Sequence, residues 1–146
     1  MFGMDQGQEG ALLLERNYMV IRRAIGWIST AILIVGQALP WTRSARPATQ
    51  AWDYVFSHVS KPNPEWWIWL LAPVAAIILS CRGLMKDGSA PRTVFVPILV
   101  FFASWAGLYL SGSVRYLGFN RPGFMATVIG LALLAVAAFL PGKKAD

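Results

Sequence analysis

Three side chains of the types found in hydrolytic triads lie close together in the chain, namely Asp53, Ser57 and His58. A triad needs a base within hydrogen-bonding reach of the nucleophile and an acid that orients the base. On a helix, however, Ser57 and His58 point about 100° apart, and Asp53 stands five positions before His58, too far round to orient it. We therefore interpret these residues as a solvated polar face, and we expect no catalytic residues and no enzyme activity.

Metal and cofactor sites are not predicted either, because the residues that build them are too few. His58 is the only histidine and Cys81 the only cysteine. One histidine excludes bis-histidine haem ligation within a chain, and one cysteine excludes an internal disulfide and a cysteine-based metal site. No phosphate-binding glycine loop or zinc-ligand spacing occurs. The basic residues are scattered between apolar runs, so nucleic acid is not an expected partner.

The elements that would have to position any site are long apolar stretches. Residues 93–111 run for 19 residues without a charge. As a helix they would measure about 28 Å, close to the roughly 30 Å of a bilayer's hydrocarbon core. Residues 24–40, 66–84 and 123–140 are also long and predominantly apolar, and only 14% of the chain is charged, against about 25% in an ordinary soluble domain. The sequence predicts an all-α, four-span transmembrane helix bundle, with residues 1–146 as a single membrane domain.

A short amphipathic helix is predicted in the first outer loop, at residues 49–59. Its apolar side chains fall within about 100° of one another on a helical wheel, opposite a polar side. A helix this short is marginal in water, so its apolar stripe needs a membrane surface or a protein surface to cover it. The candidate contacts with a partner or with lipid are Trp52, Val55, Phe56 and Val59.

A second set of candidate contacts is basic and belongs to the two predicted outer loops. If these loops touch, they form a basic, hydrogen-bonding surface at the outer end of the bundle, which would suit lipid phosphate or an acidic partner. Unconnected, solvated arginines are the alternative. The residues concerned are Arg43, Arg46, Arg115, Tyr116 and Arg121.

Basic residues also predict how the chain is threaded. If the four spans alternate in direction, eight lysines and arginines fall on one side and five on the other. The positive-inside rule then places both termini in the cytoplasm, and the size of the chain favours a bacterial inner membrane. Residues 1–10 are predicted to be a tail. A cleaved signal peptide is an alternative for the first span, with a small-x-small site at residues 36–38.

Small residues four positions apart predict where the spans pack, because helices in lipid associate through close backbone approach. Every span has such a pair, and the first has Gly26 and Thr30. Alanine-rich spans also produce this spacing by chance. The candidate packing residues of the other three spans are Ala72, Ala76, Ser80, Ala103, Gly107, Ser111, Ala126 and Gly130.

The predicted spans contain no aspartate or glutamate. A proton-coupled carrier usually needs an intramembrane carboxylate, so that class is disfavoured. Gln37 is the polar span residue that is most costly to leave unpaired. It is expected to bond to a neighbouring helix or to interfacial water, and the alternative is that it lines a ligand pocket.

The leading hypothesis is a non-enzymatic accessory or assembly subunit of a larger membrane complex. Its expected partners are the lipid bilayer and other membrane proteins or further copies of the chain. The main alternative is a small transporter or channel-like protein whose path is formed by Gln37, Ser104, Tyr109 or Thr127. A lytic pore-forming protein, and a lipid enzyme that uses the outer arginines, are weaker alternatives.

Overall fold

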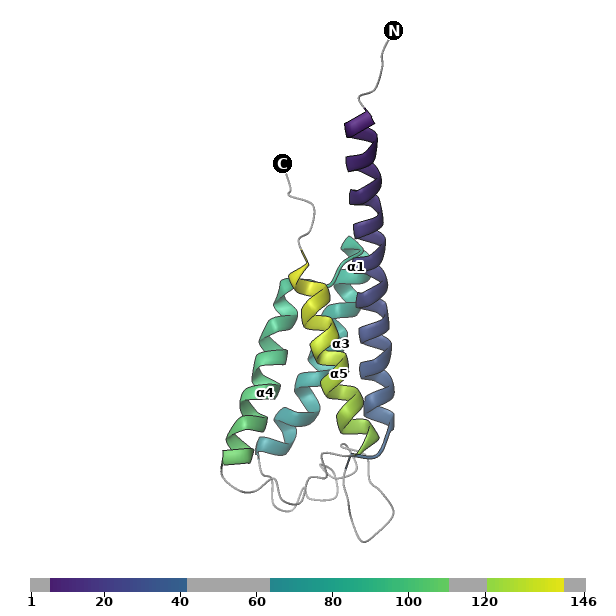
Figure 1. Cartoon of the computed structure of the whole chain (residues 1–146). Helices are drawn as coiled ribbons and strands as arrows, with labels where there is room; N and C mark the ends of the chain where they lie inside the picture. The colour runs from purple at the N-terminus through teal and green to yellow at the C-terminus, as the bar shows by residue number, and fades with distance from the viewer. Residues whose placement is uncertain (1–5, 42–63, 111–120, 141–146) are drawn as a thin grey trace.

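The computed structural model describes residues 6–41, 64–110 and 121–140, and these ranges are helical with short connections and no strand (Figure 1). The predicted all-helical class is confirmed. The predicted outer-loop helix at 49–59 lies outside the described residues. The elements are α1 (Gln6–Ala38), α3 (Pro64–Asp87), the 3-10 helix η1 (Arg92–Val94), α4 (Phe95–Leu110) and α5 (Pro122–Phe139).

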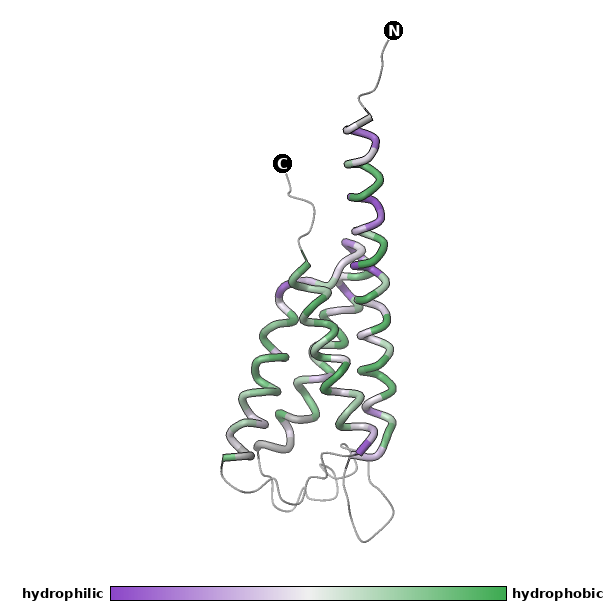
Figure 2. The backbone as a smooth tube through the Cα atoms, in the orientation of Figure 1, coloured by the Kyte–Doolittle hydropathy of each residue, from purple (hydrophilic) through white to green (hydrophobic). Residues whose placement is uncertain are grey.

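Two of these helices, α1 and α5, are long and apolar enough to cross a membrane, with mean hydropathies of 1.6 and 2.1 in their most apolar parts. A shorter apolar helix covers Arg92–Gly107. Figure 2 shows hydrophobic residues along the whole length of the bundle. Only 28% of the apolar part of α1 and 44% of that of α5 is buried, so most of their apolar surface faces outward.

The first helix begins earlier than the sequence analysis predicted. Residues 6–10 continue α1 without a break, so the prediction of a tail is wrong for them. A long helix that is already nucleated gains each further residue at little cost, and Glu9 in the first turn favours the helix dipole. The N-terminal part of α1 extends beyond the ends of the other helices (Figure 1), and we name residues 6–21, which precede Arg22, the arm.

The helix ends follow from local signals. α3 continues past the predicted end of its span at residue 84 and stops at Asp87. Gly88 follows with a φ of +67°, the left-handed conformation that commonly ends a helix at glycine. Pro122 lies in the first turn of α5, where its missing N–H costs nothing.

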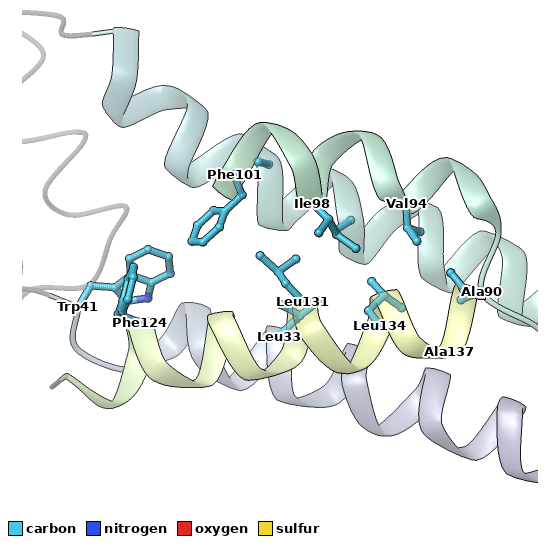
Figure 3. Close-up of a cluster of buried hydrophobic side chains, with 13 residues drawn as sticks. Leu33, Trp41, Ala90, Val94, Ile98, Phe101, Phe124, Leu131, Leu134 and Ala137 are labelled. Carbon is cyan, nitrogen blue, oxygen red and sulfur yellow. The ribbon is translucent and has the colours of Figure 1, made fainter. Parts of the chain in front are cut away.

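The helices pack as a bundle in which α1 lies along α5 and α3 lies beside α4. Large apolar side chains fill the space between α4 and α5, as Figure 3 shows for Ile98 and Phe101 on one side and Leu131 and Leu134 on the other. Leu33 of α1 is also fully buried in this core. The core therefore joins helices that are far apart in the sequence.

Two glycines allow α1 and α5 to approach closely. A methyl group placed on Gly130 would lie 2.8 Å from Leu33 Cγ and 3.2 Å from the Leu33 backbone nitrogen. A methyl group on Gly36 would lie 2.8 Å from Thr127 Oγ1. All three distances are shorter than ordinary van der Waals contact, so the absence of side chains at these positions sets the separation of the two helices.

Candidate functional site

The polar side chains inside the bundle are few, and most of their hydroxyl groups bond within their own helix. Thr30 Oγ1 donates to the Gly26 carbonyl oxygen at 2.8 Å, and Thr127 Oγ1 donates to that of Gly123 at 2.9 Å. Ser29 donates to the carbonyl of Ile25 in the same way. Bonding to the carbonyl four positions earlier satisfies a hydroxyl in apolar surroundings.

One of these hydroxyls also links α1 to α3. Thr30 Oγ1 lies 2.7 Å from Ser80 Oγ, and both side chains are buried. Because the Thr30 proton is directed to Gly26, Ser80 is the donor in the link between the helices. Gly26 approaches α3 on the same side, since a methyl group there would lie 2.8 Å from Leu84 Cδ2. The α1–α3 interface thus combines a close approach with a buried hydrogen bond.

A second polar link joins α1 to α5. Gln37 Nε2 donates to Thr127 Oγ1 at 3.2 Å. Gln37 Oε1 is buried and has no hydrogen-bond partner among the described residues. The structure thus places Gln37 against a neighbouring helix, with its amide donor used and its amide acceptor available.

Trp41 closes the same end of the bundle. Its indole Nε1 donates to the Gly36 carbonyl oxygen at 2.7 Å, and the residue is 2% exposed. Its ring packs edge to face on Phe124 at 5.9 Å and on Phe101 at 6.5 Å between ring centres (Figure 3). The Gly123 backbone nitrogen donates to the Pro40 carbonyl oxygen at 3.0 Å beside it. The turn after α1 is therefore fixed to the start of α5.

The sequence analysis missed the role of Trp41, because the predicted first span ends at residue 40 and leaves Trp41 in the loop that follows. Tryptophan directly after the end of the apolar stretch at Pro40 was the available signal, since indole rings favour the ends of membrane helices.

Arg22 holds the opposite end of the α1–α5 pair. Its Nε donates to the backbone carbonyl oxygen of Ala137 at 3.1 Å. Ala137 belongs to the last turn of α5, where carbonyl groups lack a partner in the helix and the helix dipole favours a cation. Arg82, Lys86 and Arg92, near the end of α3 and at η1, are exposed.

The candidate packing residues divide into two groups. Ala72, Ala76 and Ser80 of α3 are buried, Gly130 of α5 is buried against Leu33, and Ala126 is half-buried. By contrast, the α4 residues Ala103 and Gly107 are exposed, and a methyl group on Gly107 would meet no atom within 4 Å. Ser111 lies outside the described residues. α4 turns its bulkier Ile98 and Phe101 inward instead.

Most of the candidate partner and lipid contacts fall outside the described residues. Arg121 is described, and it is half-buried with an extended backbone immediately before α5. Ser104 of the alternative transport path is half-buried on α4. The contacts that lie outside the described residues are Trp52, Val55, Phe56, Val59, Arg43, Arg46, Arg115 and Tyr116.

The described side chains form no group of three or more His, Cys, Asp or Glu residues that could hold a metal ion. Comparison with protein families, with curated proteins and with solved structures finds no match. The polar contacts between helices and the outward surface of α1 are the features of the chain that bear on its function.

Proposed function

We propose that this chain is a small multi-pass protein of a bacterial inner membrane, with four spans and both termini in the cytoplasm. In this proposal it acts as a non-enzymatic accessory or assembly subunit of a larger membrane complex. The arm of α1 is the observation that carries the proposal, because it presents apolar side chains beyond the end of the bundle.

The membrane location is supported by the outward surface of every described helix. Large apolar side chains such as Ile34, Leu71, Val96 and Val136 are more than half exposed. Soluble monomers rarely expose apolar patches of more than a few hundred Å². Contact of this apolar surface with lipid acyl chains costs no free energy, whereas its contact with water is unfavourable.

Four crossings are consistent with the lengths of the helices. The 24 residues of α3 measure about 36 Å at 1.5 Å per residue. η1 and α4 together, with 3 and 16 residues, measure about 30 Å. Pro73 inside α3 is buried, where neighbouring helices can compensate for its missing donor. Each length therefore matches a hydrocarbon core of roughly 30 Å.

The arm supplies the argument for a protein partner. Arg22 and Arg23, together with the exposed basic residues of α3 and η1, mark the cytoplasmic end of the four-span bundle. The arm continues from there for 16 residues, or about 24 Å. Its side chains from residue 7 onward are exposed, including Leu14 at 73% and Val20 at 64%. The bilayer does not extend along the whole length of the arm. Another protein is therefore the partner best suited to cover the apolar side chains of the arm.

The outward side of α1 continues the same surface through the membrane. Isoleucine or valine recurs every seven residues there, alternating with alanine that also recurs every seven, and all six residues are exposed. This is the spacing with which a helix packs in a left-handed pair, and the alanines permit a close approach. We name this surface the outward seam, formed by Ile21, Ala24, Ile28, Ala31, Val35 and Ala38.

Site-specific photo-crosslinking in native membranes tests the proposal. A benzophenone amino acid at Leu13 of the arm or at Ile28 of the outward seam should give one discrete crosslinked protein each. The same group at Ile129, exposed on α5, should not. A product of twice the chain's mass would make the partner a second copy. A monodisperse single chain in mild detergent, without crosslinks at Leu13 and Ile28, would contradict the proposal.

A small transporter or channel-like protein is the second candidate. It is favoured by one observation, the buried and unpaired Oε1 of Gln37 beside Thr127, two of the four residues of the expected polar path. Flux through reconstituted vesicles that disappears in Gln37→Leu would support this candidate. Flux that is absent, or equal in the variant, would exclude a path through Gln37.

A further inference from the structure

A groove runs between α3 and α4 on the outside of the bundle. Its volume is about 470 Å³, and its lining is almost entirely apolar. Leu71, Ala75 and Leu79 form one wall, and Val96 and Val100 line the other. Leu71 and Val96 are more than half exposed, so the groove is open to its surroundings along its length.

One end of the groove is polar and basic. Thr93 lines the groove where η1 begins, and Arg92 directly precedes it. On the other wall, the face of α3 that lines the groove continues beyond Leu79 to Arg82 and Lys86. These two residues follow Leu79 by three and seven positions and lie within about 60° of it around the helix axis.

These three basic side chains are exposed. Asp87 is the nearest acidic residue in the sequence, but it is turned about 100° from Lys86 and about 80° from Leu79. An apolar channel that leads into three cations and a hydroxyl group is complementary to a molecule with an apolar chain and an anionic head.

We propose that this groove is a binding site for one anionic glycerophospholipid of the cytoplasmic leaflet. An acyl chain lies along the Leu71–Leu79 wall, and Arg82, Lys86 and Arg92 hold the phosphate and the negative headgroup. The inference rests on the membrane placement proposed above. Arginine binds phosphate oxygens in a bidentate manner, and each basic residue near an anionic surface raises affinity about fivefold.

A transmembrane helix of a partner fits this groove less well. A helix with its side chains is about 10 Å across and approaches closely where both walls carry small residues. The α3 wall has Ala72 and Ala75, but the α4 wall presents Val96 and Val100. A flexible acyl chain needs no such matching, and the basic end calls for an anion that an apolar helix lacks.

Native mass spectrometry of the full chain in mild detergent tests the site with phosphatidylglycerol and phosphatidylcholine that have the same acyl chains. The wild-type chain should retain phosphatidylglycerol in preference. Each of Arg82→Gln, Lys86→Gln and Arg92→Gln should weaken this binding about fivefold, and the triple variant should lose the preference. Arg16→Gln removes one charge from the arm and should leave both affinities unchanged.

The apolar part of the site is tested by filling the groove. Ala75→Trp should weaken binding of both lipids, and Ala132→Trp, on an exposed position of α5, should not. If Ala75→Trp fails to fold, Val96→Trp fills the groove from the opposite, exposed side.

Equal retention of the two lipids by the wild type, a preference unaffected by the triple variant, or binding of both lipids unaffected by groove filling would overturn the lipid site. The membrane placement is tested separately by whether the chain needs detergent to stay in solution. A chain that is soluble without detergent would overturn the placement itself.

Discussion

Arg22 of α1 donates a hydrogen bond from Nε to the backbone carbonyl oxygen of Ala137, 115 positions later in the last turn of α5. This contact fixes the register of the two helices at the point where α5 ends and the arm of α1 continues alone. A charged donor satisfies a carbonyl that has no partner within its helix and also opposes the negative end of the helix dipole. The same arginine therefore marks the boundary between the bundle and the arm.

Removal of this contact should destabilise the bundle. Arg22→Gln is expected to lower the free energy of unfolding by about 1 kcal/mol, because the charge-assisted bond and the dipole interaction are both lost. Unfolding by SDS in mixed micelles measures this change. Arg16→Gln, on the exposed arm, is the matched control and should have little effect. Equal stability of the two variants would show that Arg22 does not stabilise the α1–α5 interface.

Alanine substitutions at two glycines should affect the stability of the bundle unequally. Gly130→Ala should destabilise the bundle by about 1–3 kcal/mol, because the new methyl group has to displace Leu33 and meets its backbone nitrogen. Gly107→Ala should be neutral or stabilising by up to about 1 kcal/mol, since no atom lies within 4 Å and alanine favours helix. The same unfolding assay compares the two variants, and a larger loss at Gly107 would contradict the packing described for α4.

The link between Thr30 and Ser80 can be measured by a double-mutant cycle. Thr30→Val and Ser80→Ala should couple by about 0.6 kcal/mol, the usual value for a hydrogen bond between membrane helices. Thr30→Val on its own also removes the bond to Gly26, so the cycle is needed to isolate the contact between helices. Additive effects of the two changes would indicate that the hydroxyls do not interact.

Gln37 and Thr127 should respond unequally to substitution. Gln37→Leu removes one hydrogen bond but also removes the buried, unpaired Oε1, so we expect a change close to zero. Thr127→Val leaves the Gln37 amide without its acceptor and should cost about 1–3 kcal/mol. Thermal unfolding in detergent ranks the two variants. A greater loss in Gln37→Leu would mean that Oε1 has a partner that matters to stability.

How far the sequence predicts this structure depends on the physical origin of each feature. The all-helical class followed from apolar stretches of membrane length, and the length of α5 matches the stretch at 123–140. The spacing of small residues also placed Gly130 and Ser80 among the contact candidates, because close approach requires small side chains at fixed intervals.

The inward face of a helix was harder to predict. In a lipid environment the inward and outward residues are equally apolar, so a helical wheel does not distinguish them. On α4 the small Ala103 and Gly107 face outward while Phe101 is buried. Contacts from a side chain to a distant backbone group, such as those of Arg22 and Trp41, depend on tertiary geometry and leave no spacing pattern in the sequence.

Chemical labelling of single cysteines tests the four-span account most directly. In a Cys81→Ser background, cysteines replace Gly10, Asp87, Ser57 and Ser113 one at a time, and a membrane-impermeant maleimide is applied to vesicles of both orientations. The account predicts that Gly10 and Asp87 positions react only from the cytoplasmic side, and Ser57 and Ser113 positions only from the opposite side. Labelling of Ser57 and Asp87 positions from the same side would contradict it.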